Sequence, residues 1–164
     1  RVVTSEGAYP TFNFHVAGYG GELHKVPYKG DHDDPAALLS LAKQVGPKLI
    51  YIANPDNPMA SAHPGETILR MVEQVPEGAL LVLDEAYVDL APEGTAPAIP
   101  ADDPRVIRFR TFSKAHGMAG ARVGYAIGHS DLIEALDRVK NSFNSYPLDR
   151  LAIAGATAAM HDKE

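Results

Sequence analysis

The amino-acid sequence predicts an α/β fold with a largely parallel sheet. Strand-like and helix-like stretches alternate along the 164 residues, a pattern typical of βαβ units. Residues 79–83 form a continuous apolar run, as expected for a strand that is covered on both faces. With 45% hydrophobic and 22% charged residues, the composition is that of a globular protein large enough for one core. We therefore expect a single domain over residues 1–164.

The first part of the chain predicts two helices and two strands. Residues 10–16 run into a cluster of glycines and predict a short helix. Residues 23–28 are a plausible strand. Apolar residues recur at helical spacing after residues 33–35, whose Asp-Asp-Pro sequence suits the start of a helix. The strand predicted for residues 49–53 leads into NPDNP at 54–58, which neither a helix nor a strand accommodates.

The second part of the chain continues the alternation. Residues 91–104 contain four prolines and predict an excursion over the surface. The remaining predicted elements are a helix with its apolar face at 68–75, strands at 79–83, 106–112 and 123–127, and helices at 132–139 and 148–160.

Polar side chains that can bind a ligand or take part in catalysis follow three of the predicted strands. Asn57, Asp84 and Lys114 each lie just beyond a strand, and Thr111 and Ser113 precede the lysine. In open α/β sheets, ligands bind beyond the carboxyl ends of the strands. An acid, an amide, two hydroxyls and a lysine at this edge therefore predict a binding crevice.

Three sequence blocks carry a family resemblance. They are NPDNP at 54–58, DEAY at 84–87 and SKAHGMAGARVG at 113–124. In this order and spacing they resemble the fold-type I pyridoxal-phosphate (PLP) dependent aminotransferases, in particular the histidinol-phosphate aminotransferase-like branch. The resemblance implies the three-layer α/β/α, PLP-binding large domain over residues 1–164. Because the chain begins without Met and stops just after a helical pattern, we expect an N-terminal segment and a C-terminal small domain outside it.

The resemblance implies that PLP is the cofactor and that Lys114 carries it as a Schiff base. The lysine would then move a proton while an amino group passes between an amino acid and a 2-oxo acid. Asp84 would face the pyridine nitrogen and keep it protonated, because a neighbouring opposite charge favours the cationic form. Without the resemblance, Asp84 is equally well interpreted as a helix N-cap, and a lysine as a surface charge. Burial beside the cofactor is expected to lower the pKa of Lys114.

Other members of the predicted site follow from the same resemblance. Thr111, Ser113 and Arg122 are expected to hold the cofactor phosphate, since a guanidinium fork and short hydroxyls suit its oxygens. Asn57 and Tyr87 are expected to hydrogen-bond the phenolic oxygen of the cofactor. The alternatives are a surface ion pair for Arg122 and a packed core side chain for Tyr87.

Three local predictions remain. His15 stands where the family usually has an aromatic ring stacked on the cofactor, and it is either that stacking group or a histidine on a helix surface. The peptide bond between residues 57 and 58 is expected to be cis, because it lies in a tight loop and precedes proline. Residues 32–34 (HDD) are interpreted as solvated capping residues rather than as a metal site.

Composition narrows the function classes. A net charge of −6 argues against a nucleic-acid surface, and no apolar run approaches the length of about 20 residues that spans a membrane. The lack of cysteine fits a reducing compartment, and we expect the cytoplasm. The resemblance implies a homodimer. Two alternative functions stay open: a PLP-dependent lyase or decarboxylase of the same fold, and an aminotransferase-like sensing domain of a transcription regulator.

Overall fold

A computed structural model describes residues 1–162 of the chain. In chain order its elements are β1 (Val2–Ser5), α1 (Pro10–Gly18), β2 (Leu23–Val26), α2 (Pro35–Val45), β3 (Leu49–Ala53), α3 (Gly65–Glu73), β4 (Leu80–Asp84), the 3-10 turn η1 (Val88–Leu90), β5 (Val106–Thr111), the 3-10 turn η2 (Ala119–Ala121), β6 (Gly124–Gly128), α4 (Ser130–Phe143) and α5 (Arg150–His161). Each helix and strand that the sequence predicts is present, with its ends shifted by at most a few residues. β1 was not predicted.

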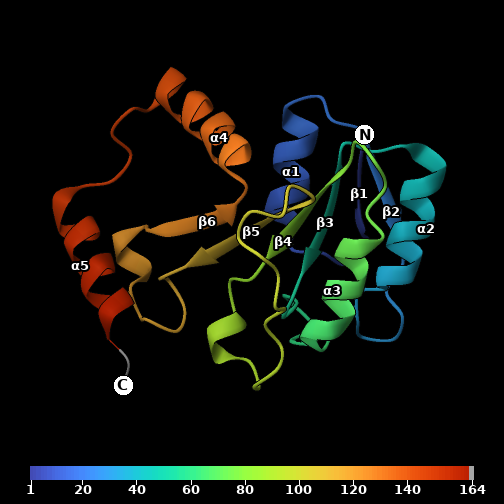
Figure 1. The fold of residues 1–164 in the computed structure, drawn as a ribbon, viewed down its shortest axis with the longest axis horizontal. Helices are drawn as coiled ribbons and strands as arrows, with labels where there is room; N and C mark the ends of the chain where they lie inside the picture. Colours follow the sequence, from blue (N-terminus) through green and yellow to red (C-terminus); the bar gives the residue numbers. More distant parts are fainter. Residues whose placement is uncertain (163–164) are drawn as a thin grey trace.

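The six strands form one sheet in the order β2-β1-β3-β4-β5-β6 (Figure 1). β1 to β5 are parallel and β6 pairs antiparallel with β5, which confirms the largely parallel sheet. β6 can approach β5 closely because it begins with Gly124, where a Cβ atom would lie 2.7 Å from the Arg110 carbonyl oxygen. The chain leaves β1 towards β2 and later returns past β1 to β3. A sheet of this kind binds ligands near such a reversal, beyond the carboxyl ends of the strands.

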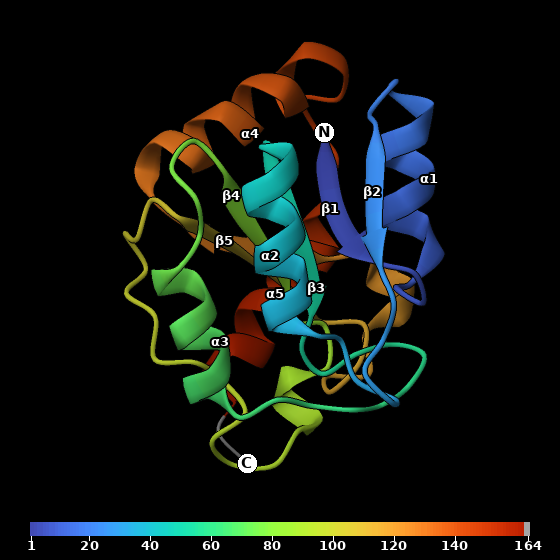
Figure 2. The same cartoon turned by 90° about the vertical axis from the view of Figure 1, so that its right-hand side faces the viewer.

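Helices cover both faces of the sheet, so the fold has the predicted three layers (Figure 2). On one face, α2 and α3 contribute Leu38 and Ile68 to the main core, where they meet Ile50 and Leu81 of the central strands. On the other face, α1 and α4 pack against Tyr51 and the side chains around it. Two-sided burial explains the continuous apolar runs of β3 and β4. α5 lies beyond β6 at one end of the molecule (Figure 1).

The ends of the helices follow local rules. Asp34 caps α2 by accepting hydrogen bonds from the backbone nitrogens of Ala36 and Ala37, and Gly46 ends the helix in the left-handed conformation. The sequence interpretation of Asp34 as a capping residue is confirmed. Asp33 differs: it is buried rather than solvated, because it faces the interior between β1 and the loop after β3. Residues 91–105 carry no helix or strand, as predicted, although Ile99 reaches back into the core.

No helix between residues 1 and 162 has the length and apolar character needed to cross a membrane.

Candidate active site

The carboxyl ends of β3, β4 and β5 surround a cavity of about 160 Å³. Asn57 enters it from the loop after β3, Asp84 is the last residue of β4, and Tyr87 lies three residues further on. Lys114 enters from the loop after β5. The strand ends are level, since the ladder between β3 and β4 pairs Ala53 with Asp84. The structure thus brings together four of the predicted side chains from three separate strand ends.

Both carboxylate oxygens of Asp84 accept a hydrogen bond from the protein. The backbone nitrogen of Ala86 donates to Oδ1 at 3.0 Å and the Tyr51 hydroxyl donates to Oδ2 at 2.9 Å. The bond from Ala86 closes a turn, whereas the cap position of the following η1 is occupied by Tyr87. Asp84 is therefore held at the floor of the cavity and does not serve as the helix cap that the sequence left open.

Tyr87 connects the other two polar groups of the cavity. Asn57 Nδ2 donates to the Tyr87 hydroxyl at 3.4 Å, and Lys114 Nζ lies 4.9 Å from the centre of the Tyr87 ring. The pKa of Lys114 is raised, and the largest influence on it is a hydrogen bond with Tyr87. Lys114 is exposed, so the structure does not show the pKa lowering by burial that the sequence led us to expect. The Asn57–Pro58 peptide is cis, as predicted, and so is Asn54–Pro55.

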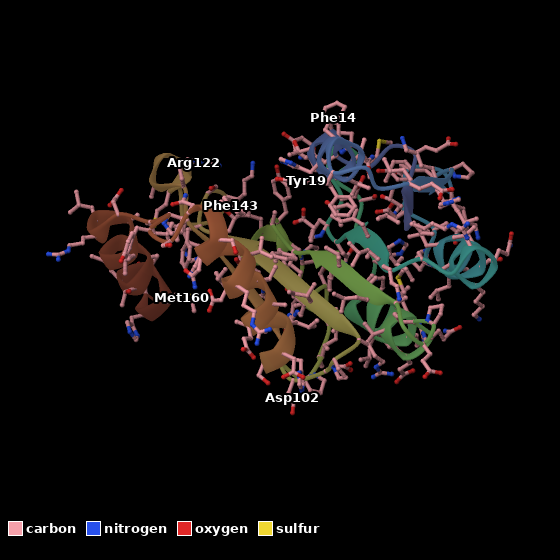
Figure 3. All side chains as sticks on the ribbon, turned by 90° about the horizontal axis from the view of Figure 1, so that it is seen from above. Phe14, Tyr19, Asp102, Arg122, Phe143 and Met160 are labelled. Atoms are coloured by element: carbon pink, nitrogen blue, oxygen red, sulfur yellow. The ribbon has the colours of Figure 1, made fainter. Side chains whose placement is uncertain are left out.

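Of the three predicted phosphate ligands, Thr111 is the last residue of β5, and Ser113 and Arg122 lie in the connection between β5 and β6. None of the three lines this cavity. The backbone nitrogen of Ser113 donates to Thr111 Oγ1 at 3.0 Å, so these hydroxyl-bearing residues shape the turn before Lys114. Arg122 has a left-handed backbone with φ of 55° and donates through Nη1 to the Ala119 carbonyl. It lies at the end of the molecule that carries α5 (Figure 3). The prediction of one pocket holds for four side chains and not for Ser113 and Arg122, whose hydrogen bonds hold them in the turn.

Arg122 nevertheless acts on the lysine. Its positive charge is among the influences on Lys114 and lowers the pKa of that ammonium, against the larger effect of Tyr87.

His15 lies on α1, exposed, and lines a second cavity of about 530 Å³ over the neighbouring face of the sheet. Phe12 and Asp84 line the same cavity, so Asp84 forms part of the wall between the two spaces. The aromatic ring of α1 that packs on the sheet is Phe12, which stacks on Tyr51 with ring centres 4.2 Å apart. His15 is therefore exposed on α1 beside the site and lines the same cavity as Asp84.

Comparison with known proteins decides the family. The family model described as "Aminotransferase class I and II" matches residues 1–164, the whole of the chain. The chain belongs to the class I and II aminotransferases.

Relatives and solved structures of these aminotransferases agree over most of the chain. "Histidinol-phosphate aminotransferase 2" of Dechloromonas aromatica is 47% identical over 162 residues, which is 99% of this chain and 44% of that protein. A histidinol-phosphate aminotransferase of Aromatoleum aromaticum is 50% identical over 115 residues, 70% of this chain and 32% of that one. The crystal structure of histidinol-phosphate aminotransferase from Sinorhizobium meliloti in complex with pyridoxal-5'-phosphate superposes with a TM-score of 0.91 at 47% identity, over 98% of this chain and 44% of that chain. The chain spans less than half of the length of each.

The sequence did not point to every residue in the site of this class I and II aminotransferase chain. Tyr51 contacts Asp84 directly, and Tyr9 lines the same cavity. A signal for Tyr51 existed: side chains of a strand alternate between faces, so Tyr51 and Ala53 share one face of β3 next to the cavity. It was hidden because the tyrosine lies in a run that otherwise consists of aliphatic residues.

Next to the cavity lies a buried acidic pair. The Tyr28 hydroxyl donates to Asp56 Oδ2 at 2.9 Å, while Oδ1 of Asp56 and Oδ1 of Asp33 have no hydrogen-bond partner within the described residues. Burial, more than the nearby charge of Asp56, raises the pKa of Asp33 to about 6. Asp56 directly precedes Asn57, so this pair of carboxyl groups adjoins the loop that carries Asn57 into the active site.

A buried ionic network joins the end of β4 to β5, the strand that precedes the loop of Lys114. Glu85 is fully buried and accepts hydrogen bonds from Arg108 and from Arg110, at 3.0 to 3.1 Å and 2.8 Å. Its backbone nitrogen also donates to the Phe109 carbonyl. The network thereby ties the end of β4, where Asp84 lies, to β5.

Proposed function

We propose that this chain is the cofactor-binding large domain of a PLP-dependent aminotransferase and that Lys114 is the residue that carries the cofactor. The observation that supports this most is the meeting of Lys114, Asp84, Asn57 and Tyr87 around one cavity at the carboxyl edge of the sheet. The set fits PLP chemically, because a PLP site needs an amine for the aldehyde and a carboxylate for the ring nitrogen. It also needs donors for the ring oxygen.

When bound, PLP supplies a protonated ring that accepts the electron pair released at the substrate's Cα. Each of the four residues around the cavity would have its own role toward the bound cofactor. Asp84 would hold a proton at the ring nitrogen, since its carboxylate is fixed by donors on both oxygens. Asn57 and Tyr87 would bind the ring oxygen, and Lys114 Nζ would take the proton from Cα.

The phosphate of the cofactor needs a separate group of donors. We propose that Thr111, Ser113 and Arg122 supply it, together with parts of the complete protein beyond this chain. Thr111 ends β5, and Ser113 and Arg122 lie in the β5–β6 connection that also carries Lys114. His15 remains a candidate for contact with the ring from the side of α1, where Phe12 is better placed by its stacking on Tyr51.

The proposed reaction is amino transfer between an amino acid and a 2-oxo acid. The relatives described above are named as histidinol-phosphate aminotransferases, so histidinol phosphate is the first amino donor to test, with 2-oxoglutarate as acceptor. A lyase or decarboxylase would instead release an unsaturated product or CO₂. Assaying glutamate formation against CO₂ release with the complete protein separates these outcomes, and CO₂ without glutamate would refute amino transfer.

We further propose that the complete protein is a homodimer of the cytoplasm. Large apolar side chains are exposed at Phe14 of α1, at Tyr19 just after α1 and at Phe143 of α4 (Figure 3), and exposed apolar surface is often covered by a partner. Light scattering on the purified complete protein tests the dimer, and cell fractionation tests the location. A transcription regulator with the same fold would bind DNA, which a mobility-shift experiment on the complete protein would reveal.

A further inference from the structure

Tyr51 is a buried side chain that the sequence did not assign to the site, and it contacts Asp84 directly. It lies in β3 and is 4% exposed, and the β3–β4 ladder pairs Ala53 with Asp84, so Tyr51 is one same-face position back along the neighbouring strand. From there its hydroxyl donates to Asp84 Oδ2 at 2.9 Å, while the Ala86 backbone nitrogen occupies Oδ1. Buried polar groups are normally hydrogen-bonded, and the partner of the Tyr51 hydroxyl is the Asp84 carboxylate at the floor of the active site.

The ring of Tyr51 is fixed in place. Phe12 of α1 stacks on it with an interplanar angle of 15°, and both rings lie in the core on this face of the sheet. Burial, followed by the negative charge of Asp84, raises the pKa of the Tyr51 phenol well above its usual value. The hydroxyl therefore keeps its proton over the whole range in which proteins function, and it remains a donor.

We propose that Tyr51 is a positioning residue for Asp84, whose hydroxyl holds the carboxylate in its ionised form and fixed orientation so that the ring nitrogen of bound PLP keeps the shared proton. This rests on the proposed function. A donor hydrogen bond stabilises a carboxylate relative to its protonated form. Without it, the proton between Asp84 and the ring nitrogen shifts to Oδ2, and the neutral ring becomes a weaker acceptor of the electron pair from Cα.

The substitution that isolates the hydroxyl is Tyr51→Phe, which keeps the buried ring and the stacking with Phe12. Tyr28→Phe is the matched control. Tyr28 also donates to a buried aspartate at 2.9 Å, but that aspartate, Asp56, does not line the 160 Å³ cavity. Both variants lose one phenol–carboxylate hydrogen bond, and only Tyr51→Phe loses it at a carboxylate that lines the cavity.

The test is the ¹⁵N NMR signal of PLP labelled at the ring nitrogen, bound to the complete protein. Tyr51→Phe is expected to move this signal towards that of an unprotonated ring and to lower kcat about tenfold at nearly unchanged KM, as the loss of one charge-assisted hydrogen bond implies. Tyr28→Phe is expected to leave the signal at the wild-type position. A Tyr51→Phe protein with the wild-type signal would overturn the proposal.

Two further outcomes are decisive. Asp84→Asn separates this proposal from the proposed function: if even Asp84→Asn leaves the ring signal unchanged, Asp84 does not face the ring nitrogen and the assignment of the site itself fails. Folding is followed by circular dichroism. If Tyr51→Phe is unfolded while Tyr28→Phe is folded, the hydroxyl stabilises the fold rather than the charge of Asp84, and the positioning role is refuted.

Discussion

Lys114 and Asp84 lie on adjacent strand ends, yet the protein holds them in contrasting ways. Asp84 is fixed by two hydrogen bonds, from Tyr51 and Ala86. Lys114 is exposed and has its main contact with Tyr87. A fixed carboxylate and an exposed amine match the parts proposed for them, because the acid must stay at one atom of the cofactor while the lysine moves a proton between two.

The first prediction concerns Lys114. In the complete protein, Lys114→Ala should abolish the visible absorbance of the lysine-bound cofactor and lower turnover by about a thousandfold or more, because both attachment and proton transfer are lost. Lys43→Ala, at an exposed position of α2, is the control and should change neither. Absorbance spectra and turnover measured on the same samples check this. Retention of both properties by Lys114→Ala would remove the residue from the mechanism.

The second prediction follows from the buried Asp33, whose pKa of about 6 lies above the value in an unfolded chain. Between these two values the folded protein binds the proton and the unfolded chain does not, so this group makes stability fall as pH rises towards 6. Asp33→Asn should remove that dependence and stabilise the protein at neutral pH by up to about 3 kcal/mol.

Urea unfolding of wild type and Asp33→Asn on both sides of this pH window measures the difference. Asp31→Asn, at an exposed neighbouring position, controls for the change in net charge. Equal stability of wild type and Asp33→Asn at neutral pH would mean that the carboxyl group is not penalised by burial.

At the scale of elements, five of the six strands were predictable from apolar runs or from alternating apolar and polar residues, and β1 was not. β3 was predicted at its observed bounds, since five apolar residues between a lysine and an Asn-Pro turn leave little alternative. β1 was missed because it has four residues, of which Thr4 and Ser5 are polar although fully buried. The antiparallel direction of β6 depends on pairing with β5, which no local pattern encodes.

The same limit applied to the site. Residues just beyond strands, such as Asn57 and Asp84, could be assigned because strand ends are visible in a sequence. Strand alternation indicated the face of β3 that carries Tyr51, but its contact with Asp84 could not be assigned, because that contact depends on the register between β3 and β4. The burial of Asp33 was missed for a related reason: it adjoins the capping residue Asp34, and only the tertiary fold separates the two environments.

The third prediction concerns the buried ion pairs that Glu85, just beyond β4, forms with two arginines of β5. Glu85→Ala leaves Arg108 and Arg110 without their buried partner and should lower the free energy of unfolding by about 3–5 kcal/mol. Glu66→Ala is the matched control, since it breaks an exposed ion pair with Arg70 on α3 and should cost about 0.5 kcal/mol or less. Chemical unfolding of both variants measures the contrast. Similar losses for the two would show that the buried network adds nothing to stability.

At the scale of the whole molecule, the chain presents one side of a site. The cavity that holds Lys114 and Asp84 is about 160 Å³, and a further cavity of about 350 Å³ adjoins it along Asn57 and Tyr87. The relatives are more than twice as long as the part that this chain matches. The groups proposed for the cofactor ring all lie within the chain, whereas groups for the substrate carboxylate are expected elsewhere in the complete protein.

The fourth prediction follows from this division. A polypeptide of residues 1–164 should bind PLP weakly and should not catalyse amino transfer, because substrate positioning contributes roughly 7–11 kcal/mol to catalysis. Adding PLP, histidinol phosphate and 2-oxoglutarate to the purified polypeptide and following glutamate tests this, with the complete protein as the positive control. Turnover of about 1 per second or more would show that these residues suffice.

The excursion between β4 and β5 divides the site in an unexpected way. Asn57, Asp84 and Tyr87 precede it and Lys114 follows it, while Asp102 lies exposed at the periphery of the molecule (Figure 3). A chain opened at Asp102 would place the lysine on one polypeptide and its partners on another. The strand pairing of β4 with β5 and the Glu85–Arg108 contact would still draw the halves together. The protein thus offers a natural position for a split reporter, in which the colour of bound PLP would signal that two fused proteins have met.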